Sequence, residues 1–172
     1  PGTVWPDFFP VVEHYRMTMG TVAQMMDLSG RKALVAGGAG HIGRAVGETL
    51  VELGANVSIL DLDMSACLER VSSLTKIRES SASAISADLS DEKSTRSAVQ
   101  KTIEKLGGLD ILVHCAAYVG TTQSPGWAVP FEQQTVAAWD TALRVNLTSA
   151  FVMIQAARTA LAASGNGSVV LF

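Results

Sequence analysis

Residues 34–45 read LVAGGAGHIGRA, with four glycines between an apolar run and a segment of helical periodicity. A turn that binds phosphate must leave a strand sharply, bring backbone N–H groups close to the anion, and lead into the start of a helix. Gly37, Gly40 and Gly43 can supply such a turn, because they follow an apolar strand and precede a helix expected over 42–53. The stretch predicts dinucleotide binding, and a purely structural turn is the alternative.

An acidic residue stands where the next expected strand, 56–60, ends. Asp61 would accept hydrogen bonds from the adenosine ribose hydroxyls and repel a phosphate on the 2′ oxygen. Because no Arg follows at Leu62 or Asp63 to offset that charge, the sequence favours NAD over NADP. An exposed acid at a strand end is the alternative. The ring of His41, in the first helical turn, could face a diphosphate or solvent, and its role stays open.

Strands and helices alternate along the rest of the chain. The apolar patterns predict further strands over 32–36, 82–87, 109–115 and 168–172, and helices over 65–77 and from a Ser90 cap to Gly107. This order predicts an α/β fold, a Rossmann-like doubly wound parallel sheet with helices on both faces in three α/β/α layers.

The composition excludes several classes of protein. The 172 residues, 48% hydrophobic and 17% charged, fit one globular domain. A net charge of −3 with scattered Lys and Arg argues against a nucleic-acid partner. No apolar run approaches the roughly 20 residues that cross a bilayer, so we expect no membrane partner. Cys67 and Cys115 match no metal-ligand spacing, so we expect no metal and read both as free thiols of a cytoplasmic protein.

The first 27 residues differ from the remainder. Prolines alternate there with aromatic residues without clear periodicity, namely Pro1, Pro6 and Pro10 with Trp5, Phe8, Phe9 and Tyr15. We interpret residues 1–27 as an arm that packs on the domain or on a neighbouring subunit, with an unstructured leader as the alternative. Residues 28–172 would form the dinucleotide-binding domain.

With these residues identified, the chain from about Leu28 to Phe172 resembles the short-chain dehydrogenase/reductase family. The family's Thr-Gly-x-x-x-Gly-x-Gly loop matches residues 36–43, with Ala36 in place of Thr and His41 in place of the middle Gly. The resulting Gly-x-x-Gly-x-x-Gly spacing also occurs in the sugar-nucleotide epimerase branch. The cofactor-binding residues expected in this half of the site are Gly37, Gly40, His41, Ile42, Gly43, Asp61 and Leu62.

Two more segments have counterparts in the family. The resemblance of ADLSD, residues 87–91, implies that Asp88 and the N–H of Leu89 bind the adenine. The family's Asn-Asn-Ala-Gly appears as His-Cys-Ala-Ala over 114–117, so that the Ala at the third position is shared. The cofactor-binding residues expected in this segment are Cys115, Ala116 and Ala117. The Cys115 thiol is favoured as a core residue, with a nucleophile as the alternative.

The segment WDTALRVNLTSAF, residues 139–151, is the most specific match and favours the dehydrogenase branch. One apolar stripe is expected along a long helix, comprising Trp139, Leu143, Leu147, Ala150, Ile154, Ala157 and Leu161. Asn146 lies on this stripe, and a buried amide without partners would cost about 1–3 kcal/mol. The resemblance implies a catalytic role for Asn146, which would hold a water in the proton relay; hydrogen bonding between helices is the alternative.

The loop over 118–134 is long for a connection between a strand and a helix, which hints at function. It leaves the carboxyl edge of the fourth expected strand, where ligands bind in such sheets. Trp127 and Phe131 could line a substrate pocket or simply anchor the loop.

Hydride transfer to a carbonyl also needs a proton donor. In the family this is a Tyr, with a Lys four residues later and a Ser nearby. Tyr15 is followed at that spacing by Met19, and Tyr118 by Thr122, so the 172 residues hold no Tyr-x-x-x-Lys. We expect the chain to be the amino-terminal part of a longer protein, truncated before that segment and inactive alone.

The resemblance implies an NAD-dependent oxidoreductase that transfers hydride between the nicotinamide and a carbonyl or alcohol substrate. The arm, together with the tendency of the family's members to form oligomers, suggests a homo-oligomer, a dimer or a tetramer. One alternative is a non-catalytic nucleotide-binding or interaction module, in which the departures at His41 and over 114–115 mark lost activity. The other is a sugar-nucleotide epimerase or dehydratase.

Overall fold

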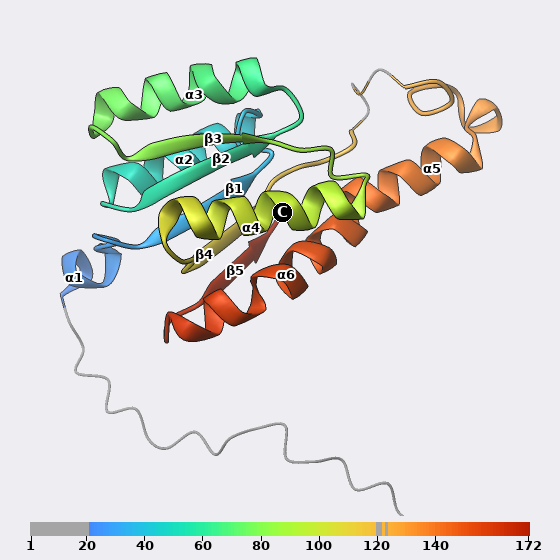
Figure 1. The fold of residues 1–172 in the computed structure, drawn as a ribbon. Coiled ribbons are helices and arrows are strands. Elements are labelled where there is room, and N and C mark those ends of the chain that lie inside the picture. The colour runs from blue at the N-terminus through green and yellow to red at the C-terminus, as the bar shows by residue number, and fades with distance from the viewer. Residues whose placement is uncertain (1–20, 120–121, 123) are drawn as a thin grey trace, which may run out of the picture.

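The computed structural model describes residues 21–119, 122 and 124–172. Its strands form one five-stranded sheet in the order β3–β2–β1–β4–β5, and every neighbouring pair is parallel (Figure 1). The strands are β1 Lys32–Ala36, β2 Asn56–Asp61, β3 Ala82–Ser86, β4 Ile111–His114 and β5 Ser168–Leu171. The parallel sheet predicted from the sequence is therefore confirmed.

Helices cover both faces of this sheet (Figure 1). One face carries α2 His41–Glu52 and α3 Met64–Ile77, and the other carries α4 Glu92–Leu106 and α6 Ser149–Ala163. Alternate residues of β1 point to opposite layers: Leu34 packs in the core beneath α4 and α6, whereas Val35 packs in the core beneath α2 and α3. The sheet is buried on both faces at its centre, and the Rossmann-like three-layer fold is confirmed.

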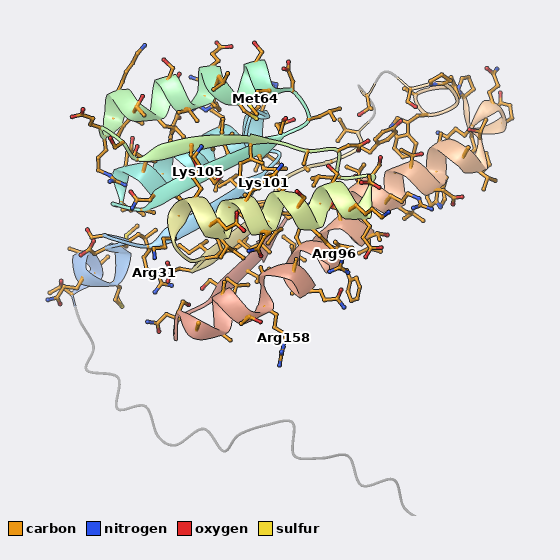
Figure 2. The ribbon with its side chains drawn as sticks, viewed as in Figure 1. Arg31, Met64, Arg96, Lys101, Lys105 and Arg158 are labelled. Atoms are coloured by element: carbon orange, nitrogen blue, oxygen red, sulfur yellow. The ribbon has the colours of Figure 1, made fainter. Side chains whose placement is uncertain are left out.

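Side chains tie together neighbouring helices of one layer and the segments at the edge of the sheet. Figure 2 shows Arg96 on α4, whose guanidinium donates to Oε1 of Gln155 on α6. At the amino-terminal edge of the sheet, Arg31 donates to the backbone carbonyl of Asn166 and lies 3.8 Å from the Asp110 carboxylate (Figure 2). This edge lies opposite the carboxyl ends of the strands, where the candidate site is found.

The cap predicted for α4 is wrong by one residue. Asp91 is the N-cap, because its Oδ2 accepts a hydrogen bond from the Ser94 N–H at 2.7 Å. Ser90 instead donates to Oδ1 of Asp88 through its N–H at 2.8 Å and its hydroxyl at 2.7 Å. Both residues can cap a helix, and the local turn at Asp88 engages Ser90 first.

The long helix after the 118–134 loop is present, but it is interrupted and its predicted buried stripe is partly wrong. It consists of α5 Val136–Leu143, a π-helical turn η2 Arg144–Thr148, and α6. Of the predicted stripe, Ala150, Ala157 and Leu161 are buried and Ile154 is half-buried. The exposed apolar residues on this helix include Trp139 (55%), Leu143 (42%), Leu147 (65%) and Phe151 (63%).

The position of α5 explains the exposed part of the stripe. In Figure 1, α5 extends past the ends of the strands, so this half of the helix has no sheet beneath it. The positions that α5 does bury carry small residues, Ala138 and Ala142. A period of 3.6 residues identifies an apolar face without saying whether the sheet reaches far enough to cover it.

Residues 1–20 of the predicted arm lie outside the described residues. The remainder of the arm contains a short helix, α1 Val22–Met26, which the sequence did not predict because five residues are too few to show a period. A capping box at its start joins Thr21 and Gln24, and the helix buries none of its residues. None of the helices in the described ranges is both long and apolar enough to span a bilayer.

Candidate functional site

The glycine turn between β1 and α2 is packed directly against the backbone that leaves β4. Gly37 has a φ of 71°, in the left-handed region, and a Cβ added there would lie 2.4 Å from the backbone nitrogen of Ala116. A Cβ added at Gly43, in the first turn of α2, would lie 2.2 Å from the carbonyl oxygen of Gly37. Neither position has room for a side chain, so the backbone itself forms the surface of the turn.

The N–H groups of the turn divide into two sets. Those of Gly38, Ala39 and Gly40 are engaged, by the Leu60 carbonyl, Oδ2 of Asp61 and the Gly37 carbonyl respectively, each at 3.1 Å. At the start of α2, the N–H groups of His41, Ile42 and Gly43 donate to no acceptor among the described residues. Free N–H groups and the partial positive charge of the helix start favour an anion at this point, and the bare backbone admits a diphosphate closely.

A cavity of about 540 Å³ opens in front of this turn, within the usual range for small-molecule sites. It brings together all the cofactor-binding residues expected from the sequence: Gly37, Gly40, His41, Ile42, Gly43, Asp61, Leu62, Asp88, Leu89, Cys115, Ala116 and Ala117. Of the other residues that line it, Ala87 and Ser90 belong to the predicted segment 87–91, and Tyr118, Val119 and Thr122 belong to the loop over 118–134. The sequence did not single out Thr141 and Val145, which also line the cavity.

Asp61 has a structural role that the sequence did not reveal. Its Oδ2 accepts the Ala39 N–H at 3.1 Å, and its Oδ1 accepts the Leu62 N–H at 2.8 Å. The carboxylate therefore holds the glycine turn to the end of β2 while it lines the cavity. Each carboxylate oxygen can accept more than one hydrogen bond, so Asp61 retains acceptor capacity for a ligand hydroxyl.

Asp88 and Leu89 form a second rim of the cavity. Oδ1 of Asp88 is held by Ser90, whereas the backbone N–H of Asp88 donates to the Ser94 hydroxyl at 3.1 Å. The Leu89 N–H donates to no acceptor in the part of the chain that the structure describes. A carboxylate beside a free N–H offers one acceptor and one donor, which suits the edge of a heterocyclic base.

Both cysteines are free thiols. Cys115 is half-buried at the cavity, and burial raises its pKa. Cys67 is fully buried in the core beneath α2 and α3, where burial raises its pKa to about 11. Both side chains are therefore protonated near neutral pH. Over the described residues, no group of three or more His, Cys, Asp or Glu side chains is arranged to hold a metal ion.

Asn146 does not line the cavity but fastens one of its segments. Its Oδ1 accepts the Tyr118 N–H at 2.6 Å, and its Nδ2 donates to the Tyr118 carbonyl at 3.3 Å. The expectation that Asn146 is buried is wrong, because the side chain is exposed on the π-helical turn η2. Its partner is the loop that leaves β4, so hydrogen bonding to another helix is also wrong.

Trp127 anchors the loop after β4 and does not line the cavity. Its Nε1 donates to the Val119 carbonyl at 2.7 Å, and its ring meets Tyr118 edge-on with centroids 5.1 Å apart. Phe131 lies in the 3-10 turn η1 Phe131–Gln133, is 87% exposed, and does not contribute to the cavity either. Of the two roles considered for these aromatic residues, anchoring applies to Trp127.

Comparison with known proteins gives a consistent result. The family model for short chain dehydrogenases matches residues 31–172. The rhamnolipids biosynthesis 3-oxoacyl-[acyl-carrier-protein] reductase of Pseudomonas aeruginosa is 38% identical over 128 residues, which are 74% of this chain and 46% of that protein. The solved structure of gox2181 has a TM-score of 0.74 at 31% identity, covering 86% of this chain and 55% of that chain.

A further similar solved structure is a complex with a nucleotide. The Pseudomonas aeruginosa RhlG/NADP active-site complex has a TM-score of 0.69 at 35% identity, covering 81% of this chain and 51% of that chain. The chain spans about half the length of the curated relatives it matches.

Proposed function

The chain belongs to the short-chain dehydrogenase family, and from this premise we propose that it is the dinucleotide-binding part of an NAD-dependent oxidoreductase. The reaction proposed is hydride transfer between the nicotinamide and a carbonyl or alcohol substrate. The observation that supports it most directly is the cavity at the glycine turn, where free N–H groups at the start of α2 and the Asp61 carboxylate line the same space.

Different residues of the chain would bind different parts of the cofactor. The first-turn N–H groups of α2 would hold the diphosphate, Asp61 the adenosine ribose, and Asp88 with the Leu89 N–H the adenine. The segment over 115–117 would form the wall beside the nicotinamide. The bound cofactor supplies a nicotinamide ring that takes up or releases hydride. Asn146 would serve the proton relay from its position on η2.

The division of the chain is also a proposal, with an arm over 1–27 and the dinucleotide-binding domain over 28–172. No Tyr-x-x-x-Lys occurs in the 172 residues, so the proposed acid–base groups lie outside them and the chain alone is expected to be inactive. Two free thiols are in keeping with a cytoplasmic location, which remains a prediction. The matching family model is that of short chain dehydrogenases and the curated relative named above is a reductase, so the epimerase alternative gains no support.

The preference for NAD rests on Asp61, because its carboxylate would meet a 2′-phosphate at close range. Calorimetry with NAD and with NADP tests this in the unmodified chain and in Asp61→Asn. The unmodified chain should bind NAD more tightly. Asp61→Asn keeps one acceptor oxygen but removes the charge, so the preference for NAD should fall about tenfold or more, which is about 1.4 kcal/mol.

Asp63→Asn is the matched control for this experiment. Asp63 caps α3, where its Oδ1 accepts the Ser65 N–H at 2.8 Å, and it does not line the cavity. The control changes the net charge equally and should leave the preference unchanged. Tighter binding of NADP by the unmodified chain would overturn the NAD assignment, and binding of neither nucleotide would overturn the proposed function.

We also propose that the chain forms a homo-oligomer through the exposed stripe of Trp139, Leu143, Leu147 and Phe151. The stripe is self-complementary about Val145, with an aromatic residue six positions away on each side and a leucine two positions away. An antiparallel, two-fold pairing would place Trp139 against Phe151 of the second copy and Leu143 against its Leu147. Such an isologous contact covers apolar surface that α5 and α6 otherwise leave exposed.

The mass of the particle in solution, measured by light scattering after size exclusion, tests this pairing. Leu147→Glu should shift the unmodified oligomer toward monomer, because it places two buried charges near the two-fold axis. Leu68→Glu is the control, since Leu68 is similarly exposed at 56% but lies on α3. Equal masses for all three proteins would contradict the proposal.

A further inference from the structure

A buried histidine connects the end of β4 to the π-helical turn. His114 is the last residue of β4 and is 2% exposed. Its Nε2 lies 2.6 Å from the hydroxyl of Ser149, the first residue of α6, which is also 2% exposed. The family pattern has Asn at the position of His114, and His presents its Nε2 farther from the backbone than the shorter Asn amide can reach.

The π-helical turn supplies the reason for this contact. In an α-helix the Ser149 N–H would donate to the Val145 carbonyl, but here it donates to the carbonyl of Arg144, one residue earlier. The Val145 carbonyl is instead bonded by the Ser149 hydroxyl at 2.7 Å. That hydroxyl has one hydrogen to give, so toward His114 it acts as the acceptor.

The direction of these bonds predicts which nitrogen of His114 carries the hydrogen. If the Ser149 hydroxyl donates to Val145, then Nε2 of His114 must carry the hydrogen that it shares with Ser149. Burial lowers the pKa of His114, which keeps the ring neutral near pH 7 and leaves one hydrogen on the imidazole. The chain of hydrogen bonds runs from His114 through Ser149 to the Val145 carbonyl.

This chain of hydrogen bonds ends at the wall of the cavity. Val145 lines the cavity, and the next residue, Asn146, bonds both backbone groups of Tyr118, which lines the cavity too. We propose that His114 is a positioning residue: through Ser149 it holds the η2 turn in its π-helical form, and so places Val145 and Asn146 relative to the loop that leaves β4. The replacement of the family's Asn by His is then a structural link and not a mark of lost activity.

The part of this inference that concerns ligand binding rests on the proposed function, so the experiment has arms with and without nucleotide. In the full chain, nitrogen-15 spectra of the imidazole should show the hydrogen of His114 on Nε2. Amide exchange over 144–149 should be at least about tenfold faster in Ser149→Ala, because the Val145 carbonyl loses its donor. The dissociation constant for NAD should rise several-fold in the same variant.

Substitutions of His114 separate hydrogen bonding from packing. His114→Gln keeps an N–H donor of similar reach, whereas His114→Leu keeps bulk without a donor. The inference predicts slow exchange over 144–149 in the Gln variant and fast exchange in the Leu variant. The opposite order would overturn it, because packing alone favours the apolar side chain. In the double variant His114→Leu with Ser149→Ala, exchange should be no faster than in Ser149→Ala alone.

Thr102→Val is the matched control. The buried Thr102 hydroxyl also donates to the carbonyl four residues earlier, that of Ala98, at 2.9 Å, but within the regular helix α4. Backbone bonding persists there, so exchange around 102 should change little. Unchanged exchange over 144–149 in Ser149→Ala would overturn the inference. If the unmodified chain does not bind NAD, the proposed function is overturned, whereas the result from amide exchange still stands.

Discussion

The two walls of the cavity are built in different ways. The glycine wall, residues 37–43, is a backbone surface pressed against the backbone of Ala116. The π-turn wall, formed by Tyr118 and Val145 and fastened by Asn146, is held by side-chain hydrogen bonds. At Gly37 and Gly43 the first cannot take up a single carbon without displacing the turn itself or the backbone that follows β4. The second is held by individual side chains, so single substitutions there should disturb the fold less.

A substitution that disrupts the glycine wall should have the largest effect on the free energy of unfolding. In Gly37→Ala the new Cβ would lie 2.4 Å from the Ala116 nitrogen, at a φ of 71°. The left-handed backbone costs about 1–2 kcal/mol and the steric overlap about 1–3 kcal/mol more. We expect the free energy of unfolding, measured with urea, to fall by about 3 kcal/mol or more.

Gly165→Ala separates the two contributions. Gly165 has the same φ of 71°, but nothing lies within 4 Å of its added Cβ. This variant should lose about 1–2 kcal/mol, the cost of the backbone conformation alone. If both variants lost equal amounts, close approach to Ala116 would contribute nothing and the contrast between the walls would fail.

Breaking the π-turn wall should have a smaller effect that depends on pH. Asn146→Asp keeps an acceptor for the Tyr118 N–H, but it replaces the donating Nδ2 with an oxygen about 3.3 Å from the Tyr118 carbonyl. Two acceptors then face each other, and we expect a loss of about 1 kcal/mol relative to the unmodified chain at pH 7. The carbonyl favours the protonated acid, so the pKa of the new carboxyl is raised and its stabilising form is present below that pKa.

The loss in Asn146→Asp should therefore shrink as the pH falls toward the ordinary carboxyl pKa of about 4. Urea unfolding of both proteins at several pH values measures this difference. Asn146→Ala, which has no group to protonate, should show a loss that stays constant with pH. A parallel pH trend in the two variants would contradict the assigned pair of bonds to Tyr118.

The smallest effect should come from Cys115, which lines the cavity that the two walls enclose. Its half-buried thiol should react slowly with a disulfide reagent at pH 8, and faster as the pH rises, because burial raises its pKa. Cys67, with a pKa of about 11 and no exposed surface, should stay unlabelled in the folded chain.

Added NAD should slow the labelling of Cys115 several-fold without changing its reagent stoichiometry after unfolding. In Cys115→Ser the slow reaction should disappear. Labelling of Cys115 that is indifferent to saturating NAD would show that the nucleotide does not lie between the walls.

The glycine wall could be predicted from the sequence because it depends on positions without side chains, and the sequence identifies its glycines directly. Gly37, Gly43 and the acid at Asp61 have a spacing that few other structures require. The sequence did not reveal that the Asp61 carboxylate also accepts a hydrogen bond from the Ala39 N–H. That bond depends on how closely two turns approach, which is a property of the assembled sheet.

The π-turn wall was predicted less well for physical reasons. An extra residue in one helical turn leaves no compositional signal, and the i, i+4 stripe of Trp139, Leu143 and Leu147 looks the same whether it faces a core or solvent. Asn146 was expected to be buried, whereas its partners come from a loop whose path the sequence does not specify. The pairing of His114 with Ser149, 35 positions apart, was likewise not visible.

The strand order has a consequence for synthesis on the ribosome. β1 lies between β2, its near neighbour in sequence, and β4, which begins about 75 residues after β1 ends. Once β2 has paired, one edge of β1 stays open while about 50 more residues are added, which takes about 2.5–10 s at translation rates of about 5–20 residues per second. During that interval the exposed backbone is a template for unwanted pairing, so the tempo of translation through residues 62–110 governs how long the emerging protein needs a chaperone.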